Sequence, residues 1–169
     1  MSVYAVAAFP SHEFSKELVG SITLAEGLGV EGDCHYDKTD QHLSRLHIKP
    51  PPANLRQVHL IPFEVLTECV VQPAEIGENV TTTGIDLLTL GSGTKLHFIT
   101  AGPTSEMMQE PHTIIQLQGV RNPVPGLTCS RIDMFRPGLK EKFVVRNEHR
   151  AIIGRKAGAM GIVEALEGK

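Results

Sequence analysis

One cysteine in the last third of the chain is the residue best suited to chemistry. Cys129 lies in the stretch RNPVPGLTCSRID (121–133), eight residues after Arg121 and two before Arg131. Neighbouring cations lower the pKa of a thiol and favour the thiolate, which attacks sulfur and binds metals. A lone cysteine is also common as a small buried apolar side chain. The sequence therefore indicates a nucleophile or a metal ligand at Cys129, with an inert core cysteine as the alternative.

A basic segment surrounds that cysteine. Residues 121–156 hold nine Lys and Arg against three Asp and Glu, a balance of +6, whereas residues 1–120 hold six against fourteen, a balance of −8. Concentrated positive charge attracts anions such as phosphate. We expect this segment either to bind a phosphate-bearing ligand or to form a solvated basic face. Nucleic acid is not an expected partner, because aromatic residues make up only 5% of the chain and there is no Trp for stacking.

Two glycine-containing stretches carry polar residues suited to a ligand. GLGVEGDCH (27–35) ends in Asp33 and His35, after glycines that let a backbone approach a ligand closely. IGENVTTTG (76–84) places Glu78 and Asn79 before three threonines. The Asn amide offers donor and acceptor groups for the edge of a heterocycle, and hydroxyls with backbone amides suit a phosphate. The alternatives are a turn that ends a strand for the first stretch, and an exposed edge strand or hairpin for the second.

The histidines do not have the spacing of a zinc finger. Cys34, His35, His42 and His47 fall in one loop, and His59 lies in the next strand pattern. We interpret His59 as an ordinary strand residue. The chain also lacks Gly-x-Ser-x-Gly and the Gly-x-Gly-x-x-Gly fingerprint of nicotinamide and flavin sites.

Short strand patterns dominate the sequence. We expect strands over residues 3–9, 21–24, 56–61, 94–100, 113–120 and 159–166, the first buried and the third half-buried. Helices are expected over 62–71, which begins with Pro62, and near 150–156. Residues 33–55 read as a long polar loop, which in a compact domain is functional or mobile. These patterns, with frequent glycine and proline, predict a mainly β, mostly antiparallel barrel with a few helices.

Length and composition predict a single domain in a reducing compartment. The chain has 169 residues, of which 41% are hydrophobic, and no apolar run is long enough to span a membrane. No basic leader precedes the apolar stretch at the N-terminus, so we expect no signal peptide. Three widely spaced cysteines do not make a disulfide framework, which favours the cytoplasm.

Six stretches together resemble the MOSC domain, the family named for the C-terminal domain of molybdenum cofactor sulfurase. They are GVEGDCH (29–35), RQVHLI (56–61), IGENVTTTGIDLLTLGSGTKL (76–96), LQGVRNP (117–123), CSRIDMFRPGL (129–139) and GRKAGAMGIVEAL (154–166). Their order and spacing match along nearly the whole chain. The resemblance implies one MOSC domain over residues 1–169, mainly β with a few helices, with a MOSC-type β-barrel that ends before the family's last short strand.

The resemblance also implies a site for a molybdenum cofactor of molybdopterin type, or for sulfur destined for a metal centre. In the family, a cysteine that follows Arg-x-Pro is proposed to carry a persulfide or to bind molybdenum through its thiolate. On this basis Cys129 is the expected catalytic residue and metal ligand. The expected cofactor-binding residues are Asp33, His35, Arg56, Glu78, Asn79, Arg121 and Asn122. Asp33 and Asn79 would position the heterocycle, and Arg121 would bind phosphate.

The sequence departs from the family pattern just before the expected cysteine. Val124 follows Arg121-Asn122-Pro123, and residues 124–128 (VPGLT) read as an insertion before Cys129. Three interpretations therefore stay open. The protein binds the molybdenum cofactor, or it carries persulfide on Cys129 without molybdenum, or it is a non-catalytic binding module whose site the insertion disrupts.

The resemblance also suggests what the protein works with. Some family members are fused to a pyridoxal-phosphate-dependent sulfurase domain, for which this chain has no room. A redox member would be part of a reductase system that acts on small N-hydroxylated compounds, and it would need an electron-donor protein. A sulfur carrier would instead need a sulfur-donor protein.

Overall fold

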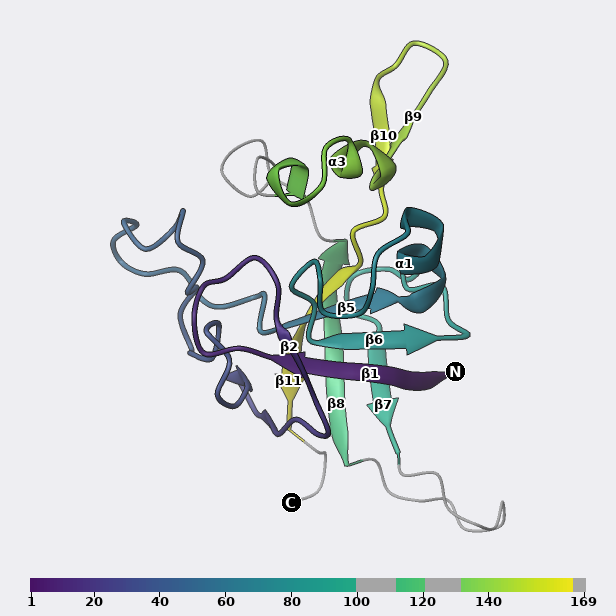
Figure 1. The fold of residues 1–169 in the computed structure, drawn as a ribbon. Helices are drawn as coiled ribbons and strands as arrows, with labels where there is room; N and C mark the ends of the chain where they lie inside the picture. The colour runs from purple at the N-terminus through teal and green to yellow at the C-terminus, as the bar shows by residue number, and fades with distance from the viewer. Residues whose placement is uncertain (100–111, 121–131, 166–169) are drawn as a thin grey trace, which may run out of the picture.

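A curled seven-stranded sheet forms the body of the protein. The computed structural model describes residues 1–99, 112–120 and 132–165 (Figure 1). The strand order is β2-β1-β6-β5-β11-β8-β7, and every neighbouring pair is antiparallel except β5 and β6. The strands are β1 (Ser2–Ala8), β2 (Glu17–Val19), β5 (Val58–Pro62), β6 (Val80–Thr83), β7 (Lys95–Phe98), β8 (Thr113–Val120) and β11 (Ala159–Glu164). The predicted mainly β, mostly antiparallel fold is confirmed.

The remaining elements lie beside this sheet. Two short two-stranded sheets pair β3 (Leu24–Ala25) with β4 (Gly29–Val30), and β9 (Val144–Arg146) with β10 (Ile152–Arg155). The helices α1 (Phe63–Cys69) and α3 (Leu139–Lys142) lie at one end of the sheet, and the β9–β10 hairpin projects beyond them (Figure 1). No helix in the described parts of the chain is long and apolar enough to cross a membrane.

Strand β5 is fully buried, so the predicted half-buried pattern over 56–61 is wrong. It lies between β6 and β11, where both of its faces are covered, and all five of its residues are buried. His59 is accommodated because its Nε2 lies 2.7 Å from the accepting carbonyl oxygen of Ala157. The interpretation of His59 as a strand residue is confirmed.

The predictions for the other strands were of mixed accuracy. Strands β7, β8 and β11 lie within the predicted segments 94–100, 113–120 and 159–166. Strand β1 forms as predicted, but only Ala7 in it is buried, because β1 lies next to the edge of the sheet. Residues 21–23 are not in a strand. The alternative of an edge strand or hairpin for 76–84 is wrong, since β6 pairs with β1 on one side and β5 on the other.

One predicted helix is present and the other is a strand. Helix α1 begins after Pro62, and its buried residues are Val65, Leu66 and Cys69. Val70 is 66% exposed and ends the helix in a left-handed conformation. The helix predicted near 150–156 is wrong: residues 152–155 form β10. The β-branched pair at 152 and 153 favours a strand.

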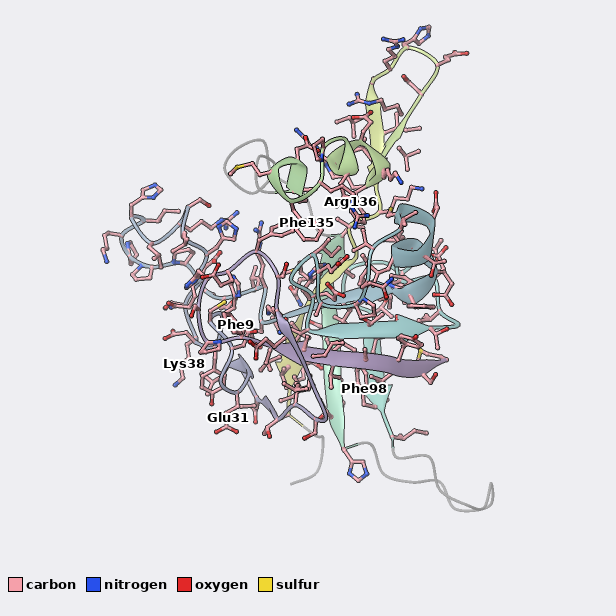
Figure 2. All side chains as sticks on the ribbon, viewed as in Figure 1. Phe9, Glu31, Lys38, Phe98, Phe135 and Arg136 are labelled. Atoms are coloured by element: carbon pink, nitrogen blue, oxygen red, sulfur yellow. The ribbon has the colours of Figure 1, made fainter. Side chains whose placement is uncertain are left out.

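The apolar core has two parts. One is enclosed by the curled sheet and contains Val30, Val58, Leu60, Val80, Leu87, Leu96, Ile115, Leu117, Ala159 and Val163. The other lies under α1 and α3 and contains Ile61, Val65, Leu66, Cys69, Val71, Ile76, Ile132, Leu139, Phe143 and Ala157. At its rim Phe135 packs against Phe14, with 5.3 Å between ring centroids, and Arg136 lies beside Phe135 (Figure 2). β5 contributes to both parts and joins the sheet to the helices.

The long polar loop predicted over 33–55 is present. Residues 31–57 contain no helix or strand beyond an isolated bridge between Thr39 and Ala53. The loop is ordered by polar contacts instead. The buried Asn54 donates from Nδ2 to the carbonyl oxygens of His35 (2.8 Å) and Asp37 (3.0 Å). These contacts hold the two ends of the loop together.

Candidate functional site

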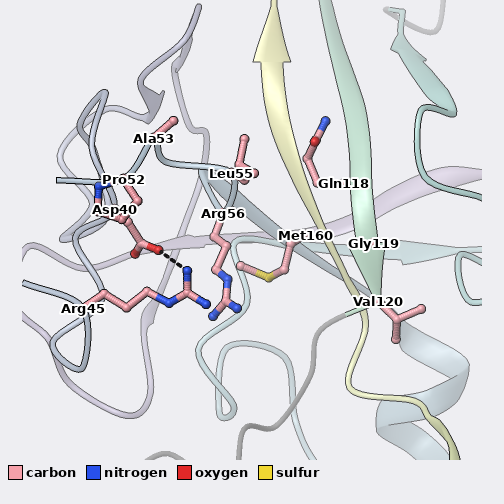
Figure 3. A pocket seen from close by; sticks show the side chains of 10 residues that line it. All are labelled: Asp40, Arg45, Pro52, Ala53, Leu55, Arg56, Gln118, Gly119, Val120 and Met160. Atoms are coloured by element: carbon pink, nitrogen blue, oxygen red, sulfur yellow. Dashed lines mark ion pairs between the residues drawn. The ribbon is translucent and has the colours of Figure 1, made fainter. Parts of the chain in front are cut away.

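A pocket of about 370 Å³ lies between the long loop and the ends of two sheet strands. The loop contributes Asp40, Arg45, Pro52, Ala53, Leu55 and Arg56, and strands β8 and β11 contribute Gln118, Gly119, Val120 and Met160 (Figure 3). Ligand pockets in proteins typically have volumes of about 300–1,000 Å³. The pocket is therefore large enough for a small molecule.

The charges of the described pocket residues do not cancel. Arg45 pairs with the buried Asp40, with 3.4 Å between Nη1 and Oδ2. Arg56 is half-buried, and its guanidinium has no hydrogen bond or ion pair with any other residue in the described parts of the chain. Its burial lowers the pKa of Arg56, and the nearby positive charge of Arg45 lowers it further. Arginine still stays protonated in proteins, so the described residues of the pocket supply two cations and one anion.

The polar contacts of the loop position both guanidinium groups. The Asn54 side-chain oxygen accepts the backbone N–H of Arg56 at 3.0 Å. This hydrogen bond fixes the backbone just before β5. Asp40 donates its backbone N–H to the Pro52 carbonyl oxygen at 2.9 Å. The two ends of the segment 40–52, which carries Arg45, therefore lie together. Figure 3 shows both guanidinium groups directed into the same space. The arrangement suits an anion, for which planar guanidinium groups are strong donors.

Asp33 is the centre of a second, buried polar network. Its Oδ2 lies 2.6 Å from Lys16 Nζ, with side chains 1% and 5% exposed, and accepts the Asn79 amide at 3.0 Å. Its Oδ1 accepts the His35 backbone N–H at 3.0 Å. Burial alone would raise the pKa of Asp33, but the His35 hydrogen bonds and the Lys16 charge outweigh it and hold the pKa well below the usual range. Asp33 is therefore ionised in the folded protein.

Asn79 joins this network to the sheet. Its side-chain oxygen accepts the His59 backbone N–H at 3.1 Å, and its Nδ2 also lies 3.2 Å from the Ala7 carbonyl oxygen. Asp33 and Asn79 are thus brought together, as their predicted common role requires. Here they contact each other and the backbone, and neither lines the pocket. Their predicted role in positioning a heterocycle stays a prediction.

Glu78 and His35 are sequence neighbours of residues that form that network. Glu78 is fully buried, and its Oε1 accepts the Ala74 backbone N–H at 2.5 Å and the Thr81 hydroxyl at 3.3 Å. The His35 side chain is 29% exposed, and its Nδ1 lies 3.0 Å from Cys34 Sγ. Of the predicted cofactor-binding residues that the structure describes, only Arg56 lines the pocket.

The thiol of Cys34 is in an environment that disfavours the thiolate. Burial raises the pKa of Cys34 to about 11, and the negative charge of Asp33 adds to this effect. Burial also raises the pKa of Cys69, which is 1% exposed, as expected for a residue on the inner face of α1. Both cysteines are therefore poor nucleophiles at neutral pH.

Three predicted site residues, Arg121, Asn122 and Cys129, lie outside the described residues. Strand β8 ends at Val120, which lines the pocket and is followed directly in the sequence by Arg121. The predictions for these three residues stay predictions.

The basic residues of 132–156 are mostly engaged in contacts of their own. Arg136 pairs with Glu75 at 3.8 Å, and ion pairs also join Arg146 to Glu141 and Lys156 to Glu68. Among the described residues, the cations that line the pocket come from the long loop. Sequence reasoning missed Arg45 and Asp40, whose only signal was their place in a polar loop too long to be a simple connection.

Comparisons with known proteins show the fold. No protein-family model and no curated protein matches the sequence. The structure is similar to that of the YUAD protein from Bacillus subtilis, with a TM-score of 0.65 and 20% identity over 96% of this chain and 87% of that one. It is also similar to a protein described only as hypothetical, with a TM-score of 0.51 and 16% identity over 99% of this chain and 71% of that one. YiiM from Escherichia coli matches at a TM-score of 0.44 and 17% identity, over 98% of this chain and 70% of that one. At these identities the first two matches show a shared fold, the curled half-barrel that the MOSC resemblance implies.

Proposed function

We propose that the protein belongs to the MOSC family and binds a phosphate-bearing pterin, the molybdenum cofactor of molybdopterin type, in the pocket beside β8. One observation carries this proposal. The half-buried guanidinium of Arg56 lies beside that of Arg45, and in the described parts of the chain only the carboxylate of Asp40 pairs with either of them. An anionic ligand would complete the charge balance of the pocket.

The residues present fit such a cofactor. The guanidinium groups of Arg45 and Arg56 would hold its phosphate through charge-assisted hydrogen bonds. Leu55, Val120 and Met160 supply apolar surface for a planar ring. Asp40 would keep Arg45 in place through its ion pair. The pocket thus offers both kinds of contact that a phosphate-bearing heterocycle needs.

Cys129 is the proposed thiolate ligand of the metal. This role rests on the sequence, since Cys129 follows the Arg-x-Pro of the family pattern after a five-residue insertion. When bound, the cofactor would supply molybdenum redox chemistry of the kind used to reduce small N-hydroxylated compounds, with electrons from a partner protein. The chain's own residues would bind and orient the cofactor and hold the substrate close to it.

The composition of the purified protein tests this proposal. The full chain and the variants Arg56→Gln and Cys129→Ser would be produced in a host that makes the cofactor. Molybdenum, pterin and cyanide-releasable sulfur would then be measured per chain. We expect wild-type protein to carry pterin and molybdenum in equal amounts, Arg56→Gln to lose both, and Cys129→Ser to lose most of the molybdenum.

Two results would contradict the proposal. Cyanide-releasable sulfur on wild-type protein without pterin would identify a persulfide carrier. Protein from the same host with neither sulfur nor pterin would identify a binding module whose site the insertion at 124–128 has disrupted.

A further inference from the structure

A thiol and two imidazoles converge outside the pocket. His12, Cys34 and His35 each offer one ligand atom, and these three atoms all lie within 4.8 Å of one another. The closest pair is Cys34 Sγ and His35 Nδ1, at 3.0 Å, and the rings of His12 and His35 are 5.3 Å apart between centroids. Ligand atoms around a tetrahedral zinc ion are about 3.3–3.8 Å apart, given bonds of about 2.0–2.3 Å. The three side chains need only a small adjustment to reach that geometry.

We propose that His12, Cys34 and His35 form a binding site for a zinc-class divalent ion. Thiolate and imidazole ligands suit zinc, whereas magnesium and calcium prefer oxygen ligands. Three protein ligands leave a fourth position for water or a further ligand, as in catalytic zinc sites. All three residues are half-buried, so the site is accessible to an ion and still held by its surroundings.

The surroundings of the His12 imidazole resemble those of a metal-bound histidine. His12 Nε2 lies 2.7 Å from the accepting carbonyl oxygen of Gln41, and an acceptor on one ring nitrogen orients the ring of a histidine that binds metal through the other. His35 is held through its backbone, because Asp33 Oδ1 accepts its N–H at 3.0 Å. Its Nδ1, which faces Cys34 Sγ, also lies 3.3 Å from Asp33 Oδ1 and would exchange that contact for the ion. Asp33 is itself held by Lys16 at 2.6 Å, so both histidines are held from outside the cluster.

The ion would link two segments that are distant in the sequence. His12 belongs to the segment between β1 and β2, whereas Cys34 and His35 begin the long loop. The carbonyl oxygen of His35 accepts from Asn54, and Asn54 holds the backbone of Arg56. Metal binding would thus tie the segment between β1 and β2 to the long loop that forms part of the pocket. The site includes neither Cys129 nor the pocket guanidiniums, so it is independent of the proposed function.

Titration of the full chain with a single metal tests this site. Chelator-treated protein would be titrated with Co²⁺ and, in competition with a chromophoric chelator, with Zn²⁺. We expect one ion per chain and a thiolate-to-cobalt absorption band. Cys34→Ser should abolish the band, and His12→Gln and His35→Gln should each weaken Zn²⁺ binding at least about tenfold, the lower end of the loss seen when a supporting residue of a metal site is removed.

Matched controls separate this cluster from the other thiols and histidines. His149→Gln, an exposed histidine in the β9–β10 turn, should bind as wild type does. Zn²⁺ should also protect Cys34, but not Cys129, from iodoacetamide in the unmodified chain, a result that depends on no variant folding. Absence of stoichiometric binding would overturn the inference. So would a cobalt–thiolate band that Cys129→Ser removes and Cys34→Ser keeps.

Discussion

Lys16 and Asp33 form an ion pair of 2.6 Å between side chains that are 5% and 1% exposed. Removal of one partner from such a pair leaves a buried charge without compensation, which costs about 3–5 kcal/mol. We therefore expect Lys16→Met to lower the free energy of unfolding by about that amount. Urea denaturation of the metal-free protein measures it. Lys38→Met, at an exposed position of the long loop, should change stability by less than about 0.5 kcal/mol. Equal effects of the two substitutions would show that the buried pair is not a stabilising contact.

The same ion pair makes the stability of the protein depend on pH. The pKa of folded Asp33 lies below its ordinary value of 3.8, because hydrogen bonds from His35 and the charge of Lys16 outweigh burial, so the native state binds fewer protons than the unfolded state. The contribution of the pair is fully present above that value and is lost as the pH falls towards the folded pKa. The stability difference between wild type and Asp33→Asn should shrink steadily below about pH 4. A difference that grows on acidification would contradict this sign.

Asn79 and Arg56 should separate structural roles from binding roles. Asn79→Ala leaves the buried His59 N–H and the Ala7 carbonyl without their side-chain partner, at about 1–3 kcal/mol for each buried group left unsatisfied. Arg56→Gln removes no hydrogen bond or ion pair of the guanidinium with the described residues, so its effect on stability should stay within about 0.5 kcal/mol. Thermal and urea unfolding of both variants tests this contrast. A stable Asn79→Ala protein with impaired ligand binding would instead support the role in positioning a heterocycle.

Gly158 holds β11 against β5 in a way that only glycine allows. Its φ is +86°, and an added Cβ would lie 2.1 Å from the Leu60 carbonyl oxygen. We expect Gly158→Ala to destabilise the protein by about 2–5 kcal/mol, from backbone strain and overpacking combined. Gly91→Ala is the matched control, because no atom lies within 4 Å of its added Cβ. A comparison of denaturation midpoints that finds no difference would contradict this packing.

The three cysteines should react at different rates in the metal-free protein. The pKa of Cys34 is raised to about 11, mainly by burial, and burial also raises that of Cys69. The basic sequence around Cys129 predicts the opposite direction for its pKa. Pulsed alkylation at neutral pH with peptide mapping should label Cys129 first. Labelling of Cys34 should accelerate as the pH rises, because its thiolate fraction increases. Native protein that labels Cys69 before Cys129 would remove the case for a reactive thiol at Cys129.

Sequence patterns correctly predicted the elements whose structure depends mainly on their own residues. Strand β7 shows the alternation of its sequence, as β8 does over residues 115–118, and α1 begins directly after the proline that indicated it. The burial of β5 was not predictable from the same alternation, because it depends on its place between β6 and β11. The strand at 152–155 was missed although its β-branched pair favours a strand, because its pairing with β9 is not visible in the segment itself.

The candidate site was only partly predictable for the same reason. Arg56 was identified by its place in a family-like stretch, but Arg45 reaches the pocket through a loop whose path depends on Asn54. Asp33 was singled out as a cofactor-binding residue, and that role stays a prediction. Its place in a buried polar network could not be predicted, because its partner Lys16 lies in a separate segment of the sequence. His12 carried no spacing signal, since the fold alone brings it to Cys34 and His35.

Equilibrium binding of molybdopterin to three proteins tests the central claim most directly. These are the wild type, Arg56→Gln and Arg150→Gln, the last at an exposed position in the basic β9–β10 hairpin. A hydrogen bond to a charged group contributes about 1.5–3 kcal/mol, which corresponds to a change of about 10–150-fold in affinity. The pocket predicts a loss of that size for Arg56→Gln and an unchanged dissociation constant for Arg150→Gln. Equal affinities for wild type and Arg56→Gln would show that the cofactor does not bind through this pocket.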